Sequence, residues 1–296
     1  MDSLKILWQF SRPHTIIGST LSILAIFAIA VGTSTYDYIP TLVLPLSLIS
    51  AIACNIYITG LNQWSDVEVD KINKPWLPIA AGTLSKKKAL RIVLVCGFIS
   101  LLSAVLLSFP FFLLILFIMS IGTAYSLPPL KLKKNYVAAA AAISVVRGLL
   151  VNIGFYLHFR HELTGSWSFT TAIIPLTIFV TAFSIGIALF KDIPDTEGDA
   201  EYKFGTLAVK NGRRSAFLIG VAVVSFAYLY IIFAALVGQL PSKWFYVFTQ
   251  LAALVFFLYQ SRQLNVGDDK QVKRFYMIFW GLFFIEYIVY PLGFYL

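Results

Sequence analysis

Nine long apolar runs constrain this chain more than any other feature of its sequence. A helix needs roughly 20 consecutive apolar residues to cross a bilayer, and a helix satisfies its backbone hydrogen bonds within the segment itself. We therefore predict an all-α integral membrane protein with nine transmembrane helices, forming a single domain over residues 1–296. The runs cover residues 14–32, 39–60, 89–108, 111–127, 136–157, 169–190, 215–237, 243–260 and 275–296.

The charged residues predict how these helices are oriented. Only 12% of the residues are charged, against about 25% in a typical soluble domain. All 23 Lys and Arg residues except Arg147, Arg160 and Lys243 flank the same side of the predicted spans. By the positive-inside rule that side is cytoplasmic, so the N-terminus is expected inside and the C-terminus outside. The net charge of +9 is thus a topology signal and no sign of a nucleic-acid partner; membrane lipid headgroups or a diphosphate are the anions expected.

The N-terminal region and the cysteines carry weaker signals. The first apolar run is a full span without a small-residue cleavage pattern, so no cleavable signal peptide is expected. No Ser- and Arg-rich transit extension precedes it, which favours a prokaryotic or already mature chain in an inner or thylakoid-type membrane. Cys54 and Cys96 lie inside apolar runs and are expected to pack as small core residues without a redox role.

The first of two acidic stretches lies in residues 61–88. Its Asn62, Asp66 and Asp70 are spaced i, i+4 and i+8, which places them on one face of a helical turn. Like charges so close together repel, so a helix tolerates them cheaply only when a cation binds between them. Pro75 is expected to end any helix before it.

The second acidic stretch lies in residues 191–214, where Asp192, Asp195 and Asp199 are spaced i, i+3 and i+7 and again share a helical face. The two stretches fall on the same side of the predicted membrane, and together they hold 8 of the 14 acidic residues. These eight are Asp66, Glu68, Asp70, Asp192, Asp195, Glu197, Asp199 and Glu201.

Two facing carboxylate clusters over an apolar bundle predict a particular chemistry. Carboxylate and carbonyl oxygens are the ligands that Mg²⁺ prefers, and two such ions can grip a diphosphate and neutralise it as it leaves. An apolar cavity below would accept a hydrocarbon tail, and aromatic faces would stabilise an allylic cation. Within the spans, Arg147 and Glu286 are further candidates, because intramembrane ionisable residues are functional suspects.

The two acidic stretches can be written as short motifs. They are Asn62-Gln63-x-x-Asp66-x-x-x-Asp70 with Asn73-Lys74-Pro75, and Lys191-Asp192-Ile193-Pro194-Asp195-x-x-Gly198-Asp199. These motifs resemble those of the UbiA superfamily of intramembrane aromatic prenyltransferases. Within it the chain is most similar to the homogentisate prenyltransferases, which include the phytyltransferases of tocopherol biosynthesis. The resemblance covers nearly the whole chain, including residues 10–18, 122–126 and 146–148.

This resemblance implies a catalytic role for the aspartates and a set of ligands. One Mg²⁺ would be held by Asn62, Asp66 and Asp70, and a second by Asp192, Asp195 and Asp199. The diphosphate would contact Lys131, Lys133, Arg147 and Lys203, and the aromatic acid would contact Arg12, His14 and Asn152. Asn62, Lys74 and Tyr125 are further expected substrate-binding residues. The implied reaction transfers a phytyl or geranylgeranyl group from its diphosphate to homogentisate, with decarboxylation, in prenylquinone biosynthesis.

Two other interpretations remain open from the sequence. The acceptor could be chlorophyllide, 4-hydroxybenzoate or dihydroxynaphthoate while the prenyl-transfer chemistry stays the same. A membrane transporter would also place charged groups in a helical bundle. It is less favoured, because the acids cluster in loops at one surface and no inverted repeat is visible.

Overall fold

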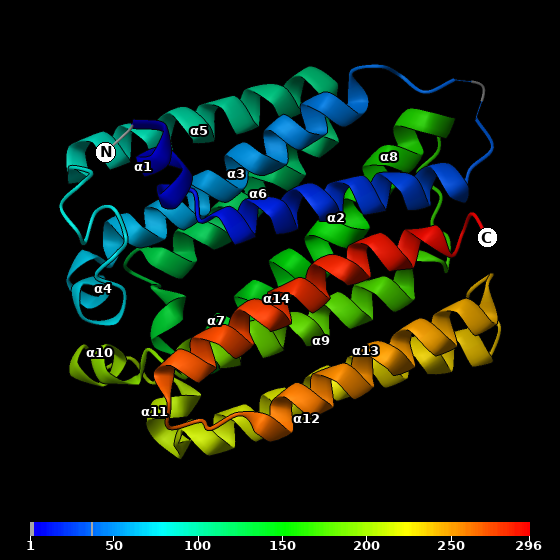
Figure 1. The fold of residues 1–296 in the computed structure, drawn as a ribbon. Coiled ribbons are helices and arrows are strands. Elements are labelled where there is room, and N and C mark those ends of the chain that lie inside the picture. The colour runs from blue at the N-terminus through cyan, green and yellow to red at the C-terminus, as the bar shows by residue number, and fades with distance from the viewer. Residues whose placement is uncertain (1–2, 37) are drawn as a thin grey trace.

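The computed structural model describes residues 3–36 and 38–296, and this part of the chain forms helices and no strand. Nine helical runs within it are long and apolar enough to cross a membrane, which confirms the predicted number. Figure 1 shows them side by side in one bundle. Their bounds are α2 (Pro13–Gly32), α3 (Val43–Ser65), α5 (Lys86–Leu107), α6 (Phe109–Ser126), α7 with η2 and α8 (Tyr136–Ser144, Val145–Gly154, Phe155–Thr164), α9 (Ile173–Asp192), α12 (Arg213–Leu236), α13 (Lys243–Gln263) and α14 (Asp269–Leu292).

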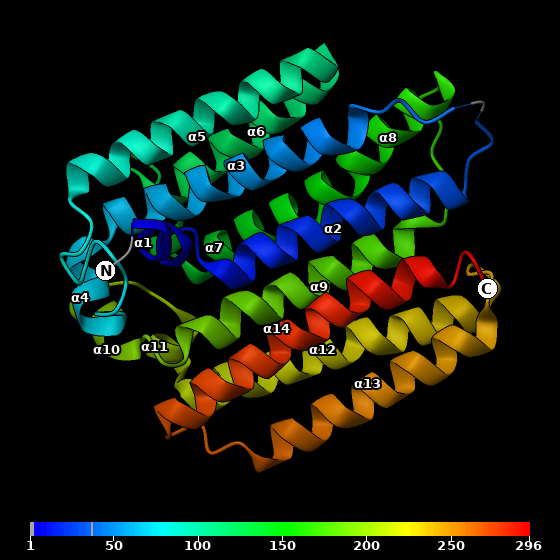
Figure 2. The same cartoon turned by 45° about the horizontal axis from the view of Figure 1, so that its top comes forward.

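Short helices gather at one end of the bundle. They are α1 (Ser3–Phe10), α4 (Val67–Asn73), η1 (Leu132–Lys134), α10 (Thr196–Glu201) and α11 (Leu207–Asn211). In Figures 1 and 2, α4 and α10 lie together at this end, whereas α8 and the C-terminus lie at the other. The two acidic stretches therefore meet on one side of the bundle, as the spacing of the spans predicts.

Helix α9 is the centre of the packing. In its most apolar stretch 78% of the residues are buried within the protein, against 28–50% for the other spans. A helix that is apolar all round is typical of such a surrounded position. Gly186 of α9 and Gly220 of α12 allow the close approach, because an added Cβ would lie 2.6 Å from Val224 and 2.4 Å from Phe190, respectively.

The outer surface of the bundle is strongly apolar. Large side chains point outward from several spans, and a contiguous apolar belt of this kind fits contact with lipid. Examples are Leu94, Phe98, Leu106, Phe117, Phe226, Phe233, Phe248 and Val255.

Several predicted span boundaries were displaced. The fifth run was expected at 136–157 but extends from Tyr136 to Thr164. The last span was expected at 275–296, but α14 begins at Asp269, because the Oδ1 of Asp268 accepts hydrogen bonds from the backbone N–H groups of Lys270 (2.9 Å) and Gln271 (3.3 Å). The second span was expected at 39–60, but α3 covers Val43–Ser65 and so carries its polar end into the acidic stretch.

Candidate active site

The first acidic stretch keeps a helical course across the junction of α3 and α4. The backbone N–H of Asp66 donates to the carbonyl of Asn62 (3.1 Å), and that of Asp70 donates to the carbonyl of Asp66 (2.8 Å). The three side chains therefore share one face, as their spacing predicts. Helix α4 then ends at Asn73, two residues before Pro75.

Helices α4 and α10 are joined through Asn73. Its Oδ1 accepts a hydrogen bond from the backbone N–H of Gly198 (3.0 Å), and its Nδ2 donates to Oδ1 of Asp199 (3.3 Å). A Cβ on Gly198 would lie 2.4 Å from the Asn73 oxygen, so only glycine fits there. Side-chain contacts between the two stretches thus fix the distance between the two acidic clusters.

All six predicted oxygen-bearing side chains line one pocket of about 630 Å³, a volume typical of small-molecule sites. The carboxylates are only 5–8% exposed. They are Asp66, Asp70, Asp192, Asp195 and Asp199, with Asn62 beside them. Below them the wall turns apolar, with Ile115, Ile118, Ile187 and Phe155 among its residues. A charged mouth over an apolar interior can hold a charged head group and a hydrocarbon tail.

Lysines pair with three of these carboxylates. Lys133 from η1 donates to Oδ2 of Asp66 (2.5 Å) and to Oγ of Ser65 (2.7 Å), and Lys131 lies 3.8 Å from the other Asp66 oxygen. The turn after α6 therefore brings Lys131 and Lys133 to the first acidic stretch.

The second acidic stretch is paired in the same way. Lys74, which follows α4, forms an ion pair with Asp195, and Lys191 donates to Oδ1 of Asp192 (2.5 Å). Lys191 was not among the predicted site residues, although it stands next to Asp192 in the sequence. The ion pair between Lys74 and Asp195 therefore also links the first acidic stretch to the second.

Removal from water shifts the pKa of several groups at the mouth. It is the largest factor raising the pKa of Asp70 to about 6 and that of Asp199 to about 7, with neighbouring carboxylates adding to it. Removal from water also lowers the pKa of the Lys133 ammonium to about 8, although Asp66 opposes this shift. Groups with such displaced pKa values in a cleft are typical of a functional site.

The donor set fits a hard cation. The six side chains offer only oxygen atoms, the ligand type that Mg²⁺ takes, and leave room for phosphate oxygens and water. In the conformation described for residues 3–36 and 38–296, no three acidic, His or Cys side chains stand close enough to hold an ion. Three of the five carboxylates, Asp66, Asp192 and Asp195, are instead paired with lysines.

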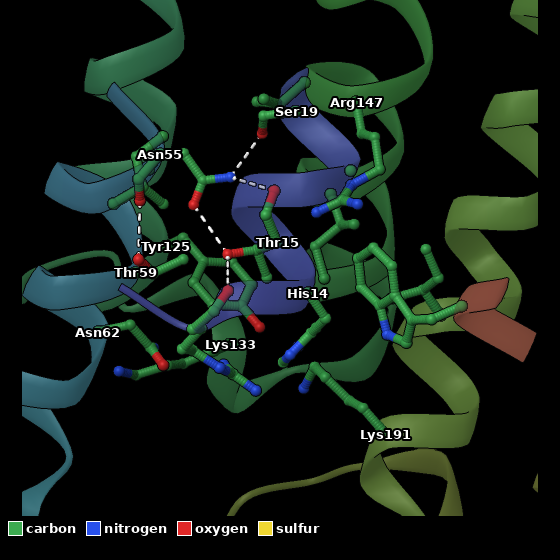
Figure 3. A pocket seen from close by; sticks show the side chains of 18 of the residues that line it. His14, Thr15, Ser19, Asn55, Thr59, Asn62, Tyr125, Lys133, Arg147 and Lys191 are labelled. Atoms are coloured by element: carbon green, nitrogen blue, oxygen red, sulfur yellow. Dashed lines mark hydrogen bonds between the residues drawn. The ribbon is translucent and has the colours of Figure 1, made fainter. Parts of the chain in front are cut away.

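The opposite part of the pocket is lined by Arg147, His14 and Trp280. The guanidinium carbon of Arg147 lies 5.0 Å from the centre of the Trp280 ring, and the His14 ring lies 5.0 Å from the same ring. Figure 3 shows Arg147 on the far side of this region from Lys133 and Lys191, with His14 between them. Arg147, which was expected to contact the diphosphate together with Lys133, therefore lies apart from Lys133.

A polar link that the sequence analysis missed joins α2 to α3. Asn55 donates to the carbonyl of Thr15 (3.0 Å) and to Oγ of Ser19 (2.6 Å), and it accepts from Oγ1 of Thr15 (3.0 Å) (Figure 3). The only sequence signal is that Asn55, Thr59 and Asn62 follow one helical face in an otherwise apolar run. Because Thr15, Ser19 and Asn55 all line the pocket, this link joins two helices of the pocket wall.

Some predicted site residues lie elsewhere. Asn152 is fully buried and uses its amide to bond the backbone carbonyls of Arg147 (2.9 Å) and Gly148 (2.8 Å), so it supports the helix and does not line the pocket. Lys203 is exposed beyond the pocket. Glu286 accepts a hydrogen bond from Gln250 (2.9 Å) between α13 and α14, also outside the pocket. The other predicted substrate contacts, Arg12 and Tyr125, do line it.

Comparisons with known proteins agree with this architecture. Residues 20–283 match the UbiA prenyltransferase family. The chain is 37% identical to the homogentisate phytyltransferase of Synechocystis sp., covering 100% of this chain and 97% of the relative, and 37% identical to homogentisate phytyltransferase 1 of Arabidopsis thaliana, covering 98% and 75%. Among solved structures, a UbiA homologue from Aeropyrum pernix K1 superposes with a TM-score of 0.70 at 16% identity, covering 95% of this chain and 96% of that one. One from Archaeoglobus fulgidus, bound to GPP and Mg²⁺, superposes with a TM-score of 0.67 at 15% identity, covering 97% and 99%.

Proposed function

This chain belongs to the UbiA prenyltransferase family, and from that premise we propose that it transfers a C20 prenyl group, phytyl or geranylgeranyl, from its diphosphate to homogentisate. The observation that carries the proposal is the meeting of two acidic stretches over one apolar pocket. The choice of acceptor is supported by the full-length similarity to homogentisate phytyltransferases.

The reaction balances without an oxidant. The C–O bond to the diphosphate breaks and its electron pair leaves with the diphosphate, while a ring carbon of homogentisate bonds to C1 of the prenyl group and loses its proton. The bond between the methylene carbon and the carboxylate also breaks, releasing CO₂, and a proton takes its place on that carbon. The products are a methylated prenyl quinol, CO₂ and diphosphate.

We propose that two Mg²⁺ ions accompany the diphosphate, one held by Asn62, Asp66 and Asp70 and the other by Asp192, Asp195 and Asp199. Bound there, the ions would neutralise the charge that develops on the departing diphosphate. The oxygen-only donor set supports this assignment.

The lysines of the mouth would exchange partners when the donor binds. Lys74, Lys133 and Lys191 hold carboxylates in the structure described here. Once a metal takes those oxygens, the same ammonium groups are free to hold phosphate oxygens through charge-assisted hydrogen bonds. The apolar wall would take the prenyl chain and keep water from the cation.

The test is an assay of purified protein with Mg²⁺, using carboxyl-labelled homogentisate and a set of prenyl diphosphates, with released CO₂ and prenylated quinol measured together. Equimolar formation of both supports the proposal. Turnover of 4-hydroxybenzoate, dihydroxynaphthoate or chlorophyllide with none of homogentisate would reject this acceptor while leaving prenyl transfer intact.

The mouth of the pocket is proposed to face the cytoplasm. The support is the positive charge that flanks the acidic end of the bundle, together with the opposite placement of the C-terminus (Figure 1). Reporter fusions after Lys88 and after Leu296 should report opposite compartments, with the Lys88 fusion inside. A Lys88 fusion that reports outside would reverse this orientation.

A further inference from the structure

We propose that Arg147, His14 and Trp280 form an anion site that binds the carboxylate of the aromatic acceptor, apart from the acidic cluster that receives the diphosphate. The inference rests on the proposed prenyl transfer and deepens it, because it assigns the residues that select an aromatic acid.

Arg147 lacks an acceptor for its guanidinium. Among the described residues, no hydrogen bond or ion pair involves its side-chain nitrogens. Its guanidinium carbon lies 5.0 Å from the centre of the Trp280 ring and 5.7 Å from the centre of the Phe283 ring. Its place, 11 residues into the run that starts at Tyr136, corresponds to a depth of about 16 Å at 1.5 Å per residue. A guanidinium at such a depth is costly unless an anion meets it.

Two further nitrogens beside Arg147 are also unsatisfied. Nε2 of His14 and Nε1 of Trp280 are buried and have no hydrogen-bond partner among the described residues. The two rings are in edge contact, with centres 5.0 Å apart and planes at 68°. The indole N–H is a donor, and so is the imidazole in its Nε2–H form. Buried donors without partners cost free energy, so a ligand that supplies acceptor oxygens is favoured here.

The protein fixes these groups in place. The amide of Asn152 bonds the backbone carbonyl of Arg147 within a wide helical turn, η2, and the neighbouring Gly148 presses against Thr181, where a Cβ would lie 2.2 Å from Oγ1. Wide turns of this kind recur at functional sites. On α2, Gly18 lies one turn after His14 and leaves room for the Trp280 ring, which an added Cβ would approach to 3.2 Å.

The charges assign the two ends of the pocket to different anions. Three of the five carboxylates at the mouth have lysine partners, and none of the five forms an ion pair with Arg147 in the part of the chain described. A diphosphate with metal ions belongs at the mouth. A single carboxylate on a small ring fits the Arg147 end, and the ring would then face the mouth and the prenyl C1.

The test measures equilibrium binding of 2,5-dihydroxyphenylacetate (homogentisate) to the purified protein without Mg²⁺ or donor. Loss of a charge-assisted pair should weaken binding by at least ~10-fold in Arg147→Met, and Arg147→Lys should fall between it and the wild type. Arg214→Met removes an exposed arginine outside the pocket and should bind as the wild type does. The neutral 2,5-dihydroxyphenylacetamide should bind the wild type and Arg147→Met equally.

The outcomes separate this inference from the proposed function. Wild-type affinity for the acid in Arg147→Met would overturn the anion site, and so would a loss of geranylgeranyl diphosphate binding with no loss of acid binding. If the wild type does not bind homogentisate but binds 4-hydroxybenzoate in an Arg147-dependent way, the anion site is supported and homogentisate is rejected as the acceptor. Should the Arg147 variants not fold, Trp280→Phe is the second test, because it removes the N–H donor and keeps an aromatic ring. Affinity about threefold weaker for the acid, with affinity for the neutral amide unchanged, supports the site, and unchanged affinity for the acid rejects it.

Discussion

Without metal, the protein should lose stability as the pH rises from 5 to 7.5. Asp70 and Asp199 have folded-state pKa values raised from 3.8 to about 6 and about 7. A carboxyl with a raised folded pKa contributes stability that is fully present below its unfolded pKa and is lost as the pH passes its folded pKa. The raised pKa values of Asp70 and Asp199 correspond to at most ~3 and ~4 kcal/mol of stability, respectively. Because the two sites share Lys74 and Asp195 as neighbours, we expect a combined loss of at least ~2 kcal/mol.

The assay is thermal unfolding in detergent with a chelator, at pH 5, 6, 7 and 7.5. A loss of ~2 kcal/mol should lower Tm by about 3 °C. Added Mg²⁺ should flatten or reverse the trend, because metal binds the deprotonated carboxylates. Asp70→Asn should remove part of the slope, whereas Asp269→Asn, on an exposed pair with Arg213, should keep it. A wild-type Tm that is constant or rises with pH in chelator would refute the reasoning.

Three further changes test the site and its surroundings. Asp66→Asn should lower prenyl transfer at least ~100-fold at saturating substrates while the protein stays folded, since it removes a charge for metal binding; near-normal rates at low Mg²⁺ would contradict the metal assignment. Gly198→Ala should lower activity at least ~10-fold, because its Cβ would displace Asn73 and separate the acidic stretches; unchanged activity would show that the contact is dispensable. Glu286→Gln should keep activity within about twofold, since this side chain lies outside the pocket; a large loss with normal melting would reveal a role in the reaction.

Hydropathy and acid spacing predicted most of the fold and the mouth of the site. The nine spans follow from run length alone, because a bilayer leaves an apolar run no other way to satisfy its backbone. The helical face shared by Asn62, Asp66 and Asp70 follows from their spacing. Helix ends were less accurate, as at α14, because a capping carboxylate begins a helix in a polar segment that hydropathy assigns to a loop.

The deeper part of the pocket could not be predicted, because spacing gives the face of a helix and not the residue opposite it. In the sequence, Trp280 is one aromatic residue among several in an apolar span. Only the packing of the bundle brings this residue of α14 against His14 and Arg147. Asn152, by contrast, was expected to contact the aromatic acid. The family resemblance implied that contact, whereas in the structure the amide of Asn152 is used by the backbone of its own helix.

The depth of Arg147 also bears on the order in which substrates bind. Lys133 and Lys191 lie at the mouth, and a diphosphate held between them would cover the path to Arg147 from that side (Figure 3). An acceptor that enters from the aqueous phase must then load first and leave as product only after diphosphate departs. Steady-state kinetics should therefore follow a compulsory order, with excess donor inhibiting competitively against the acid.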